Sequence, residues 1–351
     1  MIEFRDVLGR LIAGEDLMGQ EVEELFGRLM DGDLSVFEKT ALLVGLACKG
    51  ETPEEIAGAA RAMRERLLGV HHGQPDAVDT CGTGGDGKGT INVSTGAALC
   101  AAAAGVPIAK HGNRSVSSLS GSADVLSELG LELEQTSGLM GRCLDEVGLA
   151  FLFAPLLHPA MREVMPVRQA LGVRTVFNVL GPLTNPAGSR RQVMGVYSPK
   201  LVRPIADVLR RLGAEHALVV HGADGLDEIS TTGPTAVAEL RGSEVREVEI
   251  EPESLGLPRR SMADLLGGGP RDNAALLRDV LEGQGRPAHR EIIAINAAAA
   301  IYVGGGADDL AQGLEKAFAT LDSGAGAAKL EELVSYVKSA APAETAAGEA
   351  P

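Results

Sequence analysis

The residues most capable of chemistry lie in one glycine-rich stretch of the sequence, CGTGGDGKGTINVSTGAALCAAAAGVPIAKHGNR, which runs from Cys81 to Arg114. Its loop GTGGDGKG, residues 82–89, has glycine at five of eight positions. Because glycine has no Cβ, several backbone N–H groups in such a loop can converge on one anion. The loop therefore predicts a phosphate-binding site.

Two familiar phosphate-binding patterns overlap this loop, and neither fits it. GTGGDG satisfies G-x-G-x-x-G, but residues 88–92 separate it from any predicted helix, and Pro107 stands where a ribose-binding acid is expected. GTGGDGKG matches a P-loop except at its last position, where Gly89 replaces the Ser or Thr that holds magnesium. A dinucleotide-binding fold is excluded, and a nucleotide-binding regulatory module rests only on the incomplete match.

Polar groups follow the loop in two clusters. NVST, residues 92–95, stands where an alanine-rich helix is expected to begin, and a helix N-terminus with side-chain donors can bind an anion. KHGN, residues 110–113, follows the predicted strand VPIA, at the edge where α/β sheets bind ligands. Alone, the hydroxyls could be ordinary N-caps and the lysine a solvated one. Together the clusters favour one long ligand with phosphates at both ends.

Composition and charge restrict the partners. The chain has 351 residues, 48 acidic and 32 basic, and a net charge of −16, which disfavours nonspecific binding to nucleic acid or an anionic membrane. Its four cysteines lack a C-x-x-C pair, so reduced thiols are expected. The N-terminus MIEFRDVLGRLIAGED carries charges throughout and lacks the apolar segment of a signal peptide. We expect a cytoplasmic protein without a membrane span.

The elements that must position these residues change character near residue 72. Three amphipathic helices are expected before it, the last of which opens with the capping-box pair Thr52 and Glu55. After it, short apolar strands alternate with helices, which predicts an α/β domain with a mainly parallel central sheet. The expected strands are 106–109, 192–197 and 216–222, and the expected helices are 122–129, 202–212 and 292–303.

These patterns predict a division of the chain. Residues 1–72 form a helical domain, and the helical segment 158–181 is an excursion back to it. Residues 73–157 and 182–338 form the α/β domain. The low-complexity end, residues 339–351, is expected to be a disordered tail.

Four long segments resemble the signature segments of the anthranilate phosphoribosyltransferase family, in the family's order: GTGGDGKGTINVST, KHGNRSVSSLSGSADVL, HPAM…VRQALGVRTVFNVLGPLTNPA and HGADGLDEIS. The resemblance implies transfer of the phosphoribosyl group from phosphoribosyl pyrophosphate (PRPP) to the amino group of anthranilate. The products would be N-(5-phosphoribosyl)anthranilate and pyrophosphate, in L-tryptophan biosynthesis. PRPP is a long ligand with phosphates at both ends. The resemblance further implies a helical domain and a larger α/β domain around a cleft, and a homodimer.

The resemblance also implies a role for particular residues. Anthranilate would be bound by Gly82, Asn113 and Arg168, and one or two Mg²⁺ ions by Ser94, Asp227 and Glu228. No acid or base is assigned, and a structural role is favoured for His111 and His158. PRPP would be bound by Gly82, Gly85, Asp86, Thr90, Asn92, Val93, Ser94, Thr95, Lys110, His111, Gly112, Asn113, Arg114, Ser115, Val116, Ser117, Ser118 and Ser122.

The residue types suit these implied roles. The planar guanidinium of Arg168 matches a carboxylate, although a surface arginine is the ordinary alternative. Asp227 and Glu228 suit Mg²⁺, which takes one or two carboxylates and completes its shell with water and substrate phosphate; a solvated turn is the alternative. The aromatic amine has a free lone pair, so positioning it over an oxocarbenium-like C1 is most of the reaction.

Two departures and two rival functions remain. Leu119 stands where the family pattern often has a lysine, and Leu157 replaces the first histidine of HHPAM. A pyrimidine nucleoside phosphorylase would need one phosphate site and no acidic metal pair. A non-catalytic relative that binds nucleic acid would need a basic surface stripe, which the net charge of −16 argues against.

Overall fold

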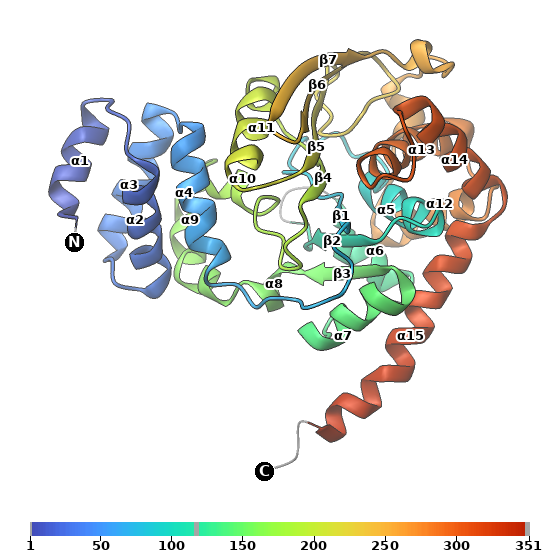
Figure 1. Cartoon of the computed structure of the whole chain (residues 1–351), viewed down its shortest axis with the longest axis horizontal. Helices are drawn as coiled ribbons and strands as arrows, with labels where there is room; N and C mark the ends of the chain where they lie inside the picture. The colour runs from blue at the N-terminus through green and yellow to red at the C-terminus, as the bar shows by residue number, and fades with distance from the viewer. Residues whose placement is uncertain (1, 116–118, 348–351) are drawn as a thin grey trace.

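The structure, a computed structural model, describes residues 2–115 and 119–347. A bundle of N-terminal helices lies on one side of the molecule, a twisted sheet occupies the middle, and a second group of helices covers the far face of the sheet (Figure 1). Within the described residues, no helix is long and apolar enough to cross a membrane. Within the described residues, no disulfide joins Cys48, Cys81, Cys100 or Cys143.

The bundle contains four helices in sequence, not the three predicted: α1 (Phe4–Ile12), α2 (Gly19–Asp31), α3 (Val36–Lys49) and α4 (Pro53–Arg64). The missed helix α1 is short and buries only Val7 and Leu11, although Phe4, Leu8 and Ile12 are also apolar. The capping box of Thr52 and Glu55 is present at the start of α4.

The sheet has the strand order β3-β2-β1-β4-β5-β6-β7. Strands β1 to β5 are parallel and the last two antiparallel, so the prediction of a mainly parallel sheet is confirmed. The strands are β1 (Val78–Asp79), β2 (Ile108–Gly112), β3 (Leu149–Phe153), β4 (Arg191–Gly195), β5 (His216–Gly222), β6 (Thr235–Arg241) and β7 (Glu244–Ile250).

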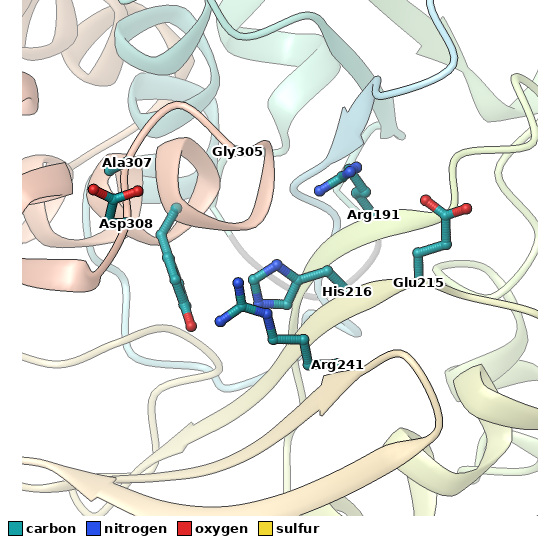
Figure 2. A pocket seen from close by; sticks show the side chains of 8 residues that line it. Arg191, Glu215, His216, Arg241, Gly305, Ala307 and Asp308 are labelled. Carbon is teal, nitrogen blue, oxygen red and sulfur yellow. The ribbon is translucent and has the colours of Figure 1, made fainter.

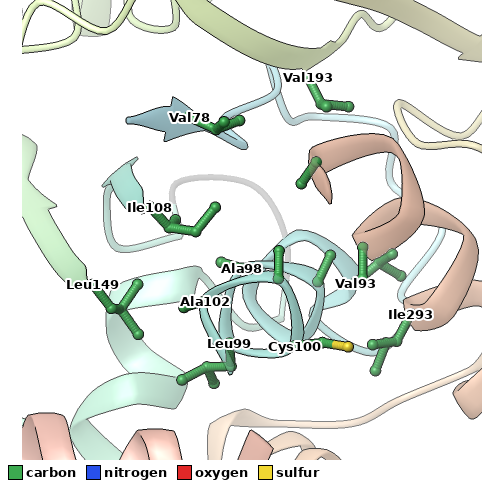
Figure 3. Packing of buried hydrophobic residues seen from close by; sticks show 14 of the residues in the cluster. Val78, Val93, Ala98, Leu99, Cys100, Ala102, Ile108, Leu149, Val193 and Ile293 are labelled. Atoms are coloured by element: carbon green, nitrogen blue, oxygen red, sulfur yellow. The ribbon is translucent and has the colours of Figure 1, made fainter. Parts of the chain in front are cut away.

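Alternation along the strands separates two hydrophobic cores. Leu218 and Val220 of β5 face one core, whereas Ala217 and Val219 face the other. The first core contains the alanine-rich helix α5 (Val93–Ala103), which packs beneath Val78 and beside helix α13 (Pro287–Val303) (Figure 3). The second core is continuous with the N-terminal bundle through contacts of α4 with α11 (Val202–Arg211).

Residues 158–181 pack on the bundle. They comprise the 3₁₀ turn η2 (Pro159–Glu163) and helices α9 (Met165–Leu171) and α10 (Phe177–Leu180), which contact α2, α3 and α4 respectively. An ion pair of 3.0 Å joins Lys39 to Glu163 across this contact. We call residues 158–181 the return segment.

The remaining elements have the following bounds: η1 (Cys143–Val147), η3 (Pro199–Leu201), η4 (Pro252–Leu255), η5 (Met262–Leu265), α6 (Ser122–Glu128), α7 (Ser137–Arg142), α8 (Ala154–Leu157), α11 (Val202–Arg211), α12 (Pro270–Leu281), α13 (Pro287–Val303), α14 (Leu310–Asp322) and α15 (Ala325–Ala347). Residues 339–347 are thus helical, which corrects the predicted disordered tail. Alanine has the highest helix propensity and is frequent there, so α15 continues. Residues 348–351 lie outside the described part of the chain.

Candidate active site

The glycine loop lies where the strand order reverses. From β1 the chain proceeds through β2 and β3 on one side, and β4 and β5 lie on the other. Ligands of α/β sheets bind at the carboxyl ends of strands beside such a reversal. The loop follows β1, and the Thr83 N–H donates to the carbonyl of Gly195, the last residue of β4, at 2.8 Å. Phosphate binding is therefore expected between the ends of β1 and β4.

The turn that carries Asp227 closes beneath this loop. The Gly84 N–H donates to Asp227 Oδ2 at 2.7 Å. A Cβ on Gly82 would lie 2.9 Å from the same oxygen, and a Cβ on Gly195 would lie 1.5 Å from the Asp227 carbonyl oxygen. Glycine is thus required at Gly195, where the obstructing atom is backbone, and a side chain at Gly82 would have to displace the Asp227 carboxylate.

Glu228, the next residue, reaches the start of helix α5. Its Oε1 accepts from the Ser94 N–H at 3.2 Å. Lys110 Nζ donates to Ser94 Oγ at 3.2 Å and to the Thr80 carbonyl at 3.3 Å. Lys110 is 3% exposed, so the alternative of a solvated lysine is wrong. Helix α5, strand β2 and the acidic turn meet at Ser94.

The two carboxylates suit a hard divalent cation. Burial and then the nearby charge of Asp86 raise the pKa of Asp227 to about 6. Burial and then the charge of Asp227 raise the pKa of Glu228 well above its ordinary value. The two carboxylates repel each other when both are ionised. A bound Mg²⁺, which accepts one or two carboxylates, would reduce that repulsion. Within residues 2–115 and 119–347, no three His, Cys, Asp or Glu side chains are grouped to hold a metal, so substrate or water oxygens would complete its shell.

The hydroxyls of Ser94 and Thr95 do not cap helix α5, which corrects the alternative explanation of the NVST segment. The N-cap is Asn92, whose side chain makes no capping bond. Instead Asn92 Oδ1 accepts from Asn273 Nδ2 at 2.8 Å, and its Nδ2 donates to the Ser120 carbonyl at 3.2 Å. The Thr95 hydroxyl is buried without a partner among the described residues, and Val93 is buried in the core.

The far end of the loop is held by residues 265–267. Thr90 forms an antiparallel bridge with Leu266, and the Gly267 N–H donates to the Gly89 carbonyl at 2.9 Å. The buried Asn273 fixes this segment by accepting from the Gly268 N–H at 2.7 Å. Asn273 was not predicted from the sequence, because nothing in its local sequence distinguishes it from a helix-surface asparagine.

The KHGN segment begins inside a strand rather than after one. Strand β2 runs from Ile108 to Gly112, two residues later than VPIA, and pairs Ile108 with Leu149 and Gly112 with Phe153. Its residues Lys110 and His111 are buried despite their polarity. The apolar pattern alone therefore placed the strand too early.

The residues after β2 form a turn against helix α6. Asn113 is exposed, and its carbonyl accepts from Ser122 Oγ at 3.3 Å. Arg114 pairs with Asp124 at 3.1 Å, and the Ser115 N–H donates to the same carboxylate at 3.0 Å. The predicted ligands Val116, Ser117 and Ser118 lie outside the described residues.

His111 and His158 form a buried pair. Their Nε2 atoms lie 3.1 Å apart, and the His111 N–H donates to Asp79 Oδ1 at 3.1 Å. Burial lowers the pKa of His111 to about 3 and that of His158 to about 4. Both imidazoles are therefore neutral near pH 7, which suits the structural role favoured for them.

Arg168 on helix α9 is half-buried, with its guanidinium 5.6 Å from the centre of the Phe177 ring. Burial lowers its pKa from the ordinary value. Among the described residues, nothing accepts a hydrogen bond from this guanidinium, and no bond joins it to Gly82 or Asn113. The structure thus leaves Arg168 available to a ligand but does not bring the three predicted anthranilate ligands into direct contact.

A cavity of about 320 Å³ lies at the opposite edge of the sheet, where β4 and β5 begin (Figure 2). Its Arg191 pairs with Asp76 at 3.0 Å. Its His216 and Tyr302 both bond to Glu239, at 3.1 and 2.6 Å. Because these side chains already satisfy one another, we assign the chemistry to the carboxyl edge rather than to this cavity.

The chain matches known families over most of its length. Residues 74–327 match "Glycosyl transferase family, a/b domain", and residues 5–67 match "Glycosyl transferase family, helical bundle domain". An anthranilate phosphoribosyltransferase of Rubrobacter xylanophilus is 53% identical over 330 residues, which cover 94% of this chain and 96% of the relative. One of Rhodopseudomonas palustris is 49% identical over 334 residues, covering 95% of this chain and 98% of the relative.

Solved structures agree with these matches. The crystal structure of anthranilate phosphoribosyltransferase from Thermus thermophilus has a TM-score of 0.90 and 45% identity, covering 95% of this chain and 99% of that one. The Saccharomyces cerevisiae enzyme in complex with PRPP and Mg has a TM-score of 0.87 and 28% identity, covering 96% and 98%. The yeast enzyme in complex with 4-fluoroanthranilate has a TM-score of 0.84 and 28% identity, covering 95% and 97%.

Proposed function

Because the chain belongs to the anthranilate phosphoribosyltransferase family, we propose that it transfers the phosphoribosyl group of PRPP to the amino group of anthranilate, releasing pyrophosphate, in tryptophan biosynthesis. The observation that carries the proposal is the contact of one acidic turn with two phosphate-binding elements. Asp227 accepts from the glycine loop, and Glu228 accepts from the start of helix α5. A bridging cation and a diphosphate fit that junction.

In this proposal, different residues bind different parts of PRPP and its metal ions. The N–H groups of the glycine loop receive the diphosphate, and Ser94, Asp227 and Glu228 hold one or two Mg²⁺ ions. When bound, Mg²⁺ neutralises diphosphate charge and makes it a better leaving group. Lys110, the segment 111–118 and Ser122 bind the donor.

The second substrate is held from the return segment. Arg168 binds the anthranilate carboxylate, and Asn113 and Gly82 line the same place. The amine needs no base to become a nucleophile, so these residues act by placing it over C1 of the ribose. The buried, neutral His111 and His158 are given no part in proton transfer.

The proposal keeps the organisation expected from the sequence. Residues 1–72 with the return segment form the helical domain, and residues 73–157 and 182–338 form the α/β domain. The hydrophobic continuity of the bundle with the return segment supports this division. A homodimer and a cytoplasmic location belong to the same proposal.

The test is the loss of anthranilate fluorescence when purified protein is mixed with PRPP and Mg²⁺, beside a sample containing EDTA. We expect the fluorescence to fall only when donor and metal are both present. Folded protein that leaves the fluorescence unchanged would contradict the proposal. Thymidine with phosphate is the control reaction, since its turnover would indicate a nucleoside phosphorylase instead.

A further inference from the structure

Arg174 reaches the glycine loop from the return segment. It lies in the exposed turn between α9 and α10. Its Nη2 donates to the Gly85 carbonyl at 2.9 Å, and its guanidinium lies 4.0 Å from the centre of the Tyr197 ring. The flat guanidinium is thus oriented by an aromatic face while it bonds the loop.

Two further contacts hold the same part of the loop. The Gly84 N–H is bonded to Asp227, and Thr83 Oγ1 accepts from the Tyr197 N–H at 3.0 Å. Gly84 and Gly85 have φ angles of 65° and 79°, in the left-handed region that glycine enters freely. A loop with this freedom needs contacts outside itself to keep one conformation, and Arg174 supplies one of them.

The bond to the Gly85 carbonyl also orients an N–H group. The chain has no cis peptide bond among its described residues, so the Gly85 carbonyl and the Asp86 N–H point in opposite directions. Arg174 therefore turns the Asp86 N–H away from itself. Within the described residues, the N–H groups of Gly85, Asp86 and Gly87 donate to no protein acceptor. Consecutive free N–H groups are suited to an anion.

We propose that Arg174 is a positioning residue that fixes the Gly85–Asp86 peptide with its N–H toward the diphosphate of the donor. The proposal rests on the proposed function. It predicts that Arg174 contributes to the binding of PRPP and not to that of anthranilate, although Arg174 lies on the same return segment as Arg168.

The test compares Arg174→Met, which keeps the stem over Tyr197 but cannot donate, with Arg174→Lys, which can. The Met variant is expected to bind PRPP with Mg²⁺ about tenfold more weakly by calorimetry, the loss typical of one charged hydrogen bond. Its kcat/KM for PRPP falls at least as far, whereas KM for anthranilate stays within about twofold. The Lys variant recovers most of the donor affinity, because its ammonium can reach the same carbonyl.

Arg162→Met is the matched control, since Arg162 is an exposed arginine of the return segment whose only side-chain bond among the described residues is to the nearby Pro159 carbonyl, at 3.4 Å. Arg162→Met should have the same PRPP affinity and the same kcat/KM for PRPP as the unaltered protein. Donor affinity unchanged in Arg174→Met, an equal loss for both substrates, or no recovery in Arg174→Lys would overturn the proposal. Unaltered protein without any transferase activity would overturn the proposed function instead. Melting temperatures verify that the exposed substitutions leave the fold intact.

Discussion

At the scale of single residues, Arg168 combines partial burial with a lack of hydrogen-bond acceptors. It is half-buried on α9 against Phe177, and no described residue accepts a hydrogen bond from its guanidinium. A desolvated charge without a partner is costly, so a ligand carboxylate at this guanidinium would bind favourably. We predict that Arg168→Ala raises KM for anthranilate about tenfold to a hundredfold, the range of a lost charged hydrogen-bond pair.

A second variant of Arg168 tests whether the charge or the shape of the side chain is what anthranilate requires. Arg168→Lys keeps the charge but not the planar fork, so it should recover only part of the loss. Initial rates with anthranilate varied at saturating PRPP give the KM, and calorimetry gives the affinity for PRPP with Mg²⁺. A variant that loses donor affinity as strongly as acceptor affinity would show that Arg168 supports the site rather than anthranilate.

At the scale of elements, the end of β4 and the acidic turn are in closer contact than any side chain allows. A Cβ on Gly195 would lie 1.5 Å from the Asp227 carbonyl oxygen, which is backbone and cannot move without displacing the turn. We predict that Gly195→Ala lowers the free energy of unfolding by about 3 kcal/mol or more, as overpacking does. Urea unfolding provides the measurement.

Gly233→Ala is the control, because a Cβ there meets nothing within 4 Å and the residue has no left-handed φ. This variant should unfold near the urea concentration of the unaltered protein. Equal stability of Gly195→Ala and Gly233→Ala would show that the turn carrying the carboxylates is free to shift, contrary to the close contact described here.

Elements were predictable from the sequence where burial is continuous and local. HALVVHG is strand β5 to the residue, because all seven positions are buried. Strand β2 was placed too early because its last residues, Lys110 to Gly112, are buried but not all apolar. Residues 339–347 were predicted to be disordered but are helical. An alanine-rich composition is compatible with a low-complexity disordered segment and with a helix, so it does not distinguish the two.

The candidate site follows the same rule. The glycine loop and the Asp227-Glu228 pair are contiguous patterns, so the sequence identified them. Arg174 contacts Gly85 of the loop from 89 positions away, and Asn273 contacts Asn92, the N-cap of α5, from 181 positions away. No local pattern can mark such contacts, since only the fold brings the two segments together.

At the scale of the whole molecule, the His111–His158 pair joins the first residue of the return segment to the central sheet. Burial lowers the pKa of His158 from 6.5 to about 4. Below the unfolded pKa of 6.5, the unfolded chain binds a proton that the native imidazole does not, so its contribution to the free energy of unfolding falls with falling pH. Above that value the contribution is constant.

A buried carboxylate opposes this dependence. Burial raises the pKa of Asp79 to about 6, so the native state binds the extra proton there as the pH falls through 6 toward 3.8. The pH dependence of the free energy of unfolding of the unaltered protein therefore does not reveal the contribution of the histidines alone. A variant is needed to separate it. We predict that His158→Gln, which cannot be protonated, loses less stability than the unaltered protein between about pH 6.5 and about pH 4.

The expected difference between the two pH profiles is about 3 kcal/mol over that range, since one pKa unit corresponds to about 1.4 kcal/mol. Urea unfolding of metal-free, ligand-free protein gives each free energy. Any packing defect from the substitution offsets the whole profile equally and leaves its slope unchanged. Parallel profiles would mean that His158 accepts its proton equally well in the native state, so that the contact between the return segment and the sheet is open to solvent.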